Sequence, residues 1–132
     1  LRGAFLQWLV YMSNTLQIAM QIYFMPSKHT TSTSGHDEIS AKGIERLDRS
    51  WRLIDVACAS PGPYMLGETF SACDLHLQML TVWHRDIVAM RARYPHVKRC
   101  AEFVEQRPAV QRIMRDHGPD WTTHHPNSPG PP

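Results

Sequence analysis

The 132-residue sequence has no long apolar run and no strong excess of either charge. A membrane-spanning helix needs about 20 consecutive apolar residues. The most apolar stretch falls short because polar residues interrupt it, namely Arg2, Gln7, Asn14 and Gln17. Fourteen basic and twelve acidic residues leave a net charge of +2, too small to indicate binding to nucleic acid or to a membrane surface. We therefore expect neither partner, no signal peptide and a cytoplasmic location.

Cysteine and histidine occur without the spacings of a disulfide framework or a metal site. The three cysteines, Cys58, Cys73 and Cys100, are odd in number and include no Cys-x-x-Cys pair. They fall within helical patterns, which predicts buried, reduced thiols of the kind found in a reducing compartment. His76 and His84 are eight residues apart on one helical pattern, and no histidine pair has the interval of a zinc-binding helix. We expect no metal site.

No segment alternates apolar and polar residues over the length of a strand, so the sequence predicts an all-α fold, a bundle of five helices. Five of the ten prolines lie in the last fourteen residues. This composition predicts a flexible Pro-rich tail at 119–132 after a helical domain at 1–118. The helices are expected at about 2–25, at 37–59, from 71 to about 90, from Pro95 and from Pro108, both prolines being suited to a first helical position.

Apolar residues cover more than one face of the first predicted helix. The stripe with helical periodicity includes Phe5, Leu9, Met12 and Leu16. Leu6, Val10 and Ile18 extend the apolar surface around the cylinder. Because a helix that serves one bundle needs a single apolar stripe, we expect part of this surface to meet a further domain or a second copy of the chain.

The second predicted helix divides cleanly into an apolar and a charged face. Its apolar positions are Ile44, Leu47, Trp51, Ile54 and Cys58. The opposite face includes Asp48 and Asp55, and the spacing of Asp48 and Arg52 suits an ion pair between successive turns. We expect this charged face to be solvated.

The most specific local signal precedes the third predicted helix. Ser71 is a good N-cap, and Asp74 stands three residues later, where its carboxylate can accept from the backbone of Ser71. Phe70 and Leu75 flank this capping box at the positions of a hydrophobic staple. These four residues are expected to fix how the chain enters its central helix.

The order of these signals resembles the C-terminal helical domain of the cytosolic glutathione transferase superfamily, in bacterial form. The matching pieces are Gln7-Trp8-Leu9-Val10-Tyr11, Pro63-Tyr64-Met65-Leu66-Gly67, Phe70-Ser71-Ala72-Cys73-Asp74 and Arg107-Pro108-Ala109-Val110. The resemblance covers about residues 2–118. It implies a five-helix bundle of the glutathione transferase C-terminal type, in which the capping box serves folding and does no chemistry.

The resemblance also implies a second domain with a separate role. Family members carry an N-terminal thioredoxin-like domain that binds glutathione, the co-substrate, and supplies the catalytic residue. That domain is not encoded in these 132 residues, so we expect no catalytic residue and no bound cofactor in this chain. The family's helical half forms one wall of the pocket for a hydrophobic electrophile and makes homodimer contacts. By position, the residues implied for that wall are Tyr11, Asn14, Thr15, Gln17 and Trp83.

Other interpretations of these residues stay open at the level of sequence. Tyr11 and Trp83 have the spacing of ordinary core residues, while Asn14 and Gln17 are equally suited to satisfying neighbouring backbone groups. The bacterial beta class has an acidic residue near Thr15 and a His-Lys pair where Gln17 and Ile18 stand, so this half is not expected to contact glutathione directly. The alternative functions are a non-catalytic, transferase-like interaction module and a free-standing helical bundle.

Overall fold

A computed structural model describes residues 1–117, and within them every regular element is helical. The first long helix comprises α1 (Arg2–Tyr11), a π-helical turn η1 (Met12–Leu16) and α2 (Gln17–Phe24). Two short 3-10 turns, η2 (Pro26–Lys28) and η3 (Thr33–Gly35), lead into the next helix. The remaining helices are α3 (His36–Cys58), α4 (Ala72–Val82), α5 (Ile87–Arg93), α6 (Pro95–Glu105) and α7 (Pro108–His117). The all-α prediction is confirmed for this part of the chain, and the expected tail at 119–132 lies outside it.

The third predicted helix is divided in two, which makes the expectation of five helices wrong. Helix α4 ends at Val82, and α5 begins at Ile87. The Asp86 carboxylate accepts from the backbone N–H of Ala89 at 2.8 Å, and so caps a new helix. The Nδ1 atom of His84 accepts from the backbone N–H of Asp86 at 3.1 Å, which fixes the turn between them. With α1, η1 and α2 counted as one helix, the described residues form six.

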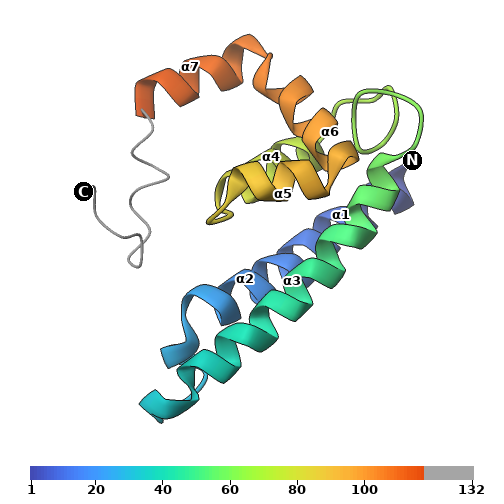
Figure 1. The fold of residues 1–132 in the computed structure, drawn as a ribbon. Coiled ribbons are helices and arrows are strands. Elements are labelled where there is room, and N and C mark those ends of the chain that lie inside the picture. Colours follow the sequence, from blue (N-terminus) through green and yellow to red (C-terminus); the bar gives the residue numbers. More distant parts are fainter. Residues whose placement is uncertain (118–132) are drawn as a thin grey trace.

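The helices form two groups (Figure 1). The first long helix and α3 run antiparallel, side by side, as two rods. Helices α4, α5 and α6 gather on one side of this pair, with α4 against α1 and α6 against α3. Helix α7 extends away from α6, its main neighbour. None of the helices in residues 1–117 is long and apolar enough to cross a membrane.

The two rods approach each other closely at Gly43 of α3, which is buried. A Cβ atom added there would lie 2.7 Å from the backbone nitrogen of Tyr23 and 2.8 Å from its Cα. One turn earlier, the Ser40 hydroxyl donates to the Tyr23 carbonyl at 3.3 Å. The backbone of α2 therefore rests directly on the backbone of α3 at this crossing.

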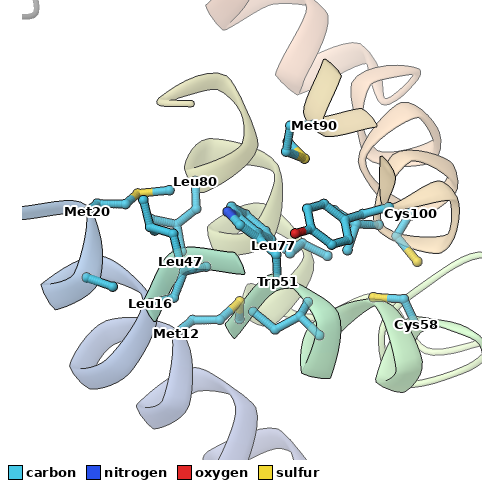
Figure 2. Packing of buried hydrophobic residues seen from close by; sticks show 14 of the residues in the cluster. Met12, Leu16, Met20, Leu47, Trp51, Cys58, Leu77, Leu80, Met90 and Cys100 are labelled. Atoms are coloured by element: carbon cyan, nitrogen blue, oxygen red, sulfur yellow. The ribbon is translucent and has the colours of Figure 1, made fainter. Parts of the chain in front are cut away.

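Trp51 of α3 stands in the middle of the core (Figure 2), and only 1% of its surface is exposed. It packs among side chains from both helix groups, with the ring of Tyr94 stacked 6.3 Å from its own. The other labelled members of the core cluster are Met12, Leu16, Met20, Leu47, Cys58, Leu77, Leu80, Met90 and Cys100. The expected apolar face of α3 is confirmed apart from Ile44, half of which is exposed.

Two carboxylates on the charged face of α3 join α3 to α5 and α6, so the expectation that this face is only solvated is wrong. Asp48 accepts from the Tyr94 hydroxyl at 2.7 Å and pairs with Arg93 at 2.6 Å and with Arg52 at 2.8 Å. The hydrogen bond from Tyr94 and the two nearby guanidinium groups lower the pKa of Asp48. Asp55 accepts from the backbone N–H groups of His96 and Val97, both at 2.9 Å, and thereby caps α6.

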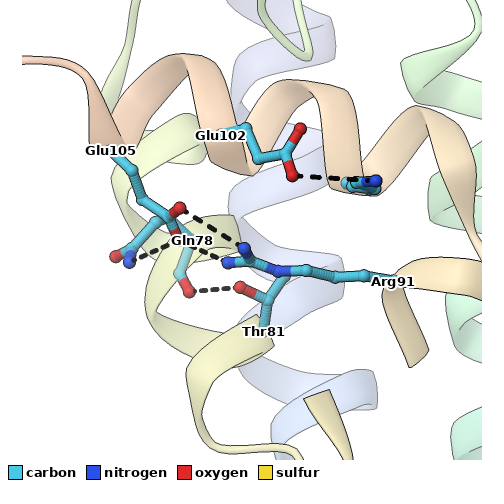
Figure 3. Close-up of polar contacts among 6 residues, drawn as sticks. Gln78, Thr81, Arg91, Glu102 and Glu105 are labelled. Atoms are coloured by element: carbon cyan, nitrogen blue, oxygen red, sulfur yellow. Dashed lines mark hydrogen bonds and ion pairs between the residues drawn. The ribbon is translucent and has the colours of Figure 1, made fainter. Parts of the chain in front are cut away.

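A second polar cluster joins α4, α5 and α6 (Figure 3). Arg91 of α5 pairs with Glu105 of α6, and about a fifth of each side chain is exposed. The amide of Gln78 on α4 donates to the same carboxylate at 3.5 Å, and the Thr81 hydroxyl donates to the Gln78 carbonyl at 2.7 Å. This largely buried ion pair, with the Gln78 amide, links the three helices to one another.

The close approach at Gly43 predicts that the fold is more stable with glycine at this position than with alanine. In an ordinary helix interior, replacing glycine by alanine raises stability by about 1 kcal/mol. We expect Gly43→Ala instead to lower the free energy of unfolding by about 1–3 kcal/mol, because its Cβ has to displace backbone. Urea unfolding followed by circular dichroism measures the change.

Gly3→Ala is the matched control, since Gly3 is also helical and has no atom within 4 Å of an added Cβ. It should leave the midpoint unchanged or raise it. Equal effects of the two substitutions would contradict the close crossing.

Candidate functional site

An open groove of about 610 Å³ runs along the outer side of α1 and into the π-helical turn. We call it the first-helix groove. Its lining residues are Gly3, Leu6, Gln7, Val10, Tyr11, Asn14 and Thr15. They recur at intervals of three and four residues, so they form a single stripe on the helix. Three of the five residues that the resemblance implied for a ligand wall, Tyr11, Asn14 and Thr15, thus lie together.

The groove combines apolar walls with neutral polar groups. Leu6 is 47% exposed and Val10 is 53% exposed, so both offer apolar surface to the groove. Within residues 1–117, the side chains of Tyr11, Asn14 and Thr15 make no hydrogen bond to the protein. The Tyr11 ring is held by an edge contact with Trp8, at 5.7 Å between centroids. Such a lining favours an apolar ligand with a few hydrogen-bonding atoms.

The polar end of the groove coincides with the π-helical turn at Met12–Leu16. Met12 and Leu16 are both fully buried, while Asn14 between them is exposed. The hydroxyl of Ser13 donates to the carbonyl of Leu9 at 2.8 Å, which competes with regular helical bonding. π-helical turns are rare and occur frequently at functional sites. The sequence analysis missed this turn, although Ser13, Asn14 and Thr15 are three successive poor helix formers.

The structure does not bring the other two implied wall residues into the groove. Gln17 begins α2 and is partly buried, but it is not among the lining residues. Trp83 follows the last residue of α4 and packs against the core cluster. Conversely, the groove includes Gly3, Leu6, Gln7 and Val10, which the sequence analysis did not assign to a ligand site. Their helical spacing from Tyr11 and Asn14 is the signal that identifies them.

The capping box before α4 is confirmed. The Ser71 side chain accepts from the backbone N–H of Cys73 at 3.2 Å, and the Asp74 carboxylate accepts from the backbone N–H of Ser71 at 2.8 Å. Asp74 is fully buried, and its other oxygen accepts from the backbone N–H of Met65 at 2.8 Å. The carboxylate therefore holds the preceding loop as well as the start of the helix.

The hydrophobic staple expected from Phe70 and Leu75 stays a prediction. Leu75 is 43% exposed. The Phe70 ring contacts the ring of Tyr64 at 5.4 Å, and the guanidinium of Arg107 lies 3.6 Å from its centroid. Phe70 thus contacts the preceding loop and the turn between α6 and α7.

The loop between α3 and α4 needs glycine at two positions. Gly67 has a φ of 81° and pairs with Tyr64 through both backbone hydrogen bonds. Gly62 has a φ of 111°, and a Cβ added there would lie 2.4 Å from the carbonyl carbon of Gly67. Only glycine fits a backbone contact this close. The compact turn places Met65 where Asp74 accepts its N–H.

The burial predicted for the three cysteines is confirmed, and all three are free. Burial lowers the pKa of His76 and of His84, which favours their neutral forms. In residues 1–117, no group of three or more His, Cys, Asp or Glu side chains could hold a metal ion.

The chain matches no protein-family model, no curated protein and no solved structure.

The geometry of Asp74 predicts a large loss of stability on its removal. Asp74→Ala should lower the free energy of unfolding by about 2–4 kcal/mol, because it removes the cap and leaves a buried backbone N–H without an acceptor. Glu45→Ala is the control, since Glu45 makes only an exposed ion pair with Lys42 and should cost about 0.5 kcal/mol or less. Denaturant midpoints of the two variants provide the comparison, and similar midpoints would contradict the assigned role.

Proposed function

We propose that this chain is the helical domain of a glutathione transferase-like protein and that its first-helix groove is one wall of the binding site for a hydrophobic electrophile. The observation that carries the proposal is the convergence of Tyr11, Asn14 and Thr15 on one groove. The resemblance to the glutathione transferase helical domain implies the same three residues for a ligand wall.

The chemistry of the groove supports binding rather than catalysis by this chain. Leu6 and Val10 offer exposed apolar surface, and burial of that surface is worth about 25 cal/mol per Å². The Tyr11 hydroxyl, the Asn14 amide and the Thr15 hydroxyl are neutral groups suited to orienting a ligand. No lining residue is ordinarily charged or a strong nucleophile at neutral pH. In the proposed protein, a thioredoxin-like domain holds glutathione, the co-substrate, and activates its thiol.

The proposed wall contributes to the reaction by positioning the electrophile. Holding an electrophilic carbon within reach of a bound thiolate converts an encounter between two molecules into a step within one complex. An open groove along a helix is suited to this role because a second domain can close its exposed side. The open side of the first-helix groove supports such an arrangement.

Binding of a neutral aryl halide tests the groove directly. We expect 1-chloro-2,4-dinitrobenzene to bind the chain and Val10→Lys to weaken binding about fivefold or more, since losing about 1 kcal/mol of apolar contact has this effect. Ligand-observed NMR titration measures the affinity without requiring turnover.

Val56→Lys is the matched control, because Val56 is 72% exposed on α3 and does not line the groove. It should leave the affinity unchanged. Equal weakening by both substitutions, or no binding to the unmodified chain, would refute the proposed wall.

The exposed apolar surface of the first long helix favours a second candidate, a transferase-like interaction module or homodimer contact. Ile18, in α2, is 36% exposed and does not line the groove. If this surface joins two copies, sedimentation velocity should detect a dimer that Ile18→Lys weakens and Val56→Lys does not. A monomer at all concentrations would exclude the dimer contact. Loss of association with unchanged aryl halide binding would separate the two functions.

A further inference from the structure

Two cysteines that are far apart in sequence meet between α3 and α6. Cys58 is the last residue of α3, and Cys100 lies within α6. Both thiols are free and fully buried, and their side chains lie beside each other, close enough to interact directly. Figure 2 shows the pair together at the edge of the core, on neighbouring helices. Contact between two thiols is the first requirement for joining them by a disulfide.

Charges around the pair make its two thiols unequal. Contact with Cys58 and the adjacent Arg99 guanidinium lower the pKa of Cys100, against the opposing effects of burial and of Asp74. Contact with Cys100, burial and the charges of Asp55 and Asp74 raise the pKa of Cys58. The positive charge of Arg99 beside Cys100 therefore favours ionisation of Cys100 before that of Cys58.

Arg99 holds this arrangement in place. Its guanidinium donates to the backbone carbonyl of Cys58 and, at 3.3 Å, to that of Ser60. These carbonyls belong to the end of α3, where the helix has no further backbone donors to offer. The Arg99 side chain thus places a fixed positive charge beside the pair and covers the end of α3.

The third cysteine is equally buried but has no neighbouring thiol. Cys73 is fully buried, and its thiol donates to the carbonyl of Phe5 at 3.3 Å. Burial raises its pKa, and no other thiol contacts it. Cys73 is therefore an internal reference for an inert thiol in the same chain.

We propose that Cys58 and Cys100 form a redox-active pair that a peroxide converts into an intramolecular disulfide joining α3 to α6. The first step is attack of the Cys100 thiolate on a peroxide oxygen. An S–O bond forms, the O–O bond breaks, and hydroxide leaves and is protonated to water. Cys100 is then a sulfenic acid, oxidised by two electrons, and the peroxide has been reduced.

The second step uses the proton that Cys58 has kept. The Cys58 sulfur attacks the Cys100 sulfur, so that an S–S bond forms and the S–O bond breaks. Hydroxide leaves and takes the Cys58 proton to become a second water. Two thiols and one hydrogen peroxide thus give one disulfide and two waters, and a dithiol reductant reverses the change. The pair is separate from the first-helix groove and does not depend on its proposed function.

Oxidation of the pair should also stabilise the fold. The disulfide would close a loop that contains the capping turn and the whole of α4 and α5. Cross-links of this span raise stability chiefly by restricting the unfolded chain. We expect the melting temperature to rise by about 5–15 °C on oxidation.

Peptide mapping after peroxide treatment tests the pair. The reduced full chain is exposed to hydrogen peroxide at pH 8, the remaining thiols are alkylated, and the digest is analysed by mass spectrometry. We expect a Cys58–Cys100 cross-linked peptide 2 Da lighter than the two thiol peptides together, with Cys73 recovered as a thiol. Treatment with dithiothreitol should remove the cross-link and the rise in melting temperature.

Three variants complete the experiment. Cys73→Ser should retain the cross-link, while Cys58→Ser and Cys100→Ser should lose it. Circular dichroism of each variant establishes that it folds, and the peptide map of the unmodified chain does not depend on them. A cross-link that includes Cys73, a disulfide between two chains, or oxidation of all three cysteines at equal rates would overturn the proposal.

Discussion

The buried carboxylate of Asp74 is the constraint on which the connection between the two helix groups depends. It accepts from Ser71 at the start of α4 and from Met65 in the preceding loop, so one side chain sets both the helix start and the path that leads to it. A buried carboxylate is costly unless its hydrogen bonds are satisfied. The loop can satisfy them only with its backbone folded tightly at Gly62 and Gly67. The position of α4 against α1, and hence much of the core, follows from this local requirement.

The parts of the fold that the sequence predicted are those with local causes. Pro95 and Pro108 begin helices because proline suits the first turn, and the Ser71 and Asp74 cap depends on residues three positions apart. The division between α4 and α5 was missed because the apolar pattern continues across the capping Asp86. Asp48 and Asp55 were assigned to a solvated face because periodicity alone does not show whether a carboxylate meets water or the start of another helix.

The candidate site shows the same limit. Tyr11, Asn14 and Thr15 share one helix, so their spacing is enough to place them on one side of it. Trp83 directly follows α4, and its relation to the groove depends on how α4 packs, which no local pattern specifies. The π-helical turn adds a residue to the outer side of the first long helix at the polar end of the groove. A regular periodicity of 3.6 residues does not include such an addition.

Helix α7 packs chiefly against a single helix, α6, whereas the other helices each pack against several elements. Its backbone bonds are therefore protected by little more than one packed side, with Val110 buried and Ile113 largely exposed. This packing predicts a low free energy of local opening for α7 in native-state hydrogen exchange. The amide protons of α3 and α4 are expected to exchange only when the core is disrupted. The amide protons of this chain thus form a hierarchy, in which the last helix is released before the antiparallel rods separate.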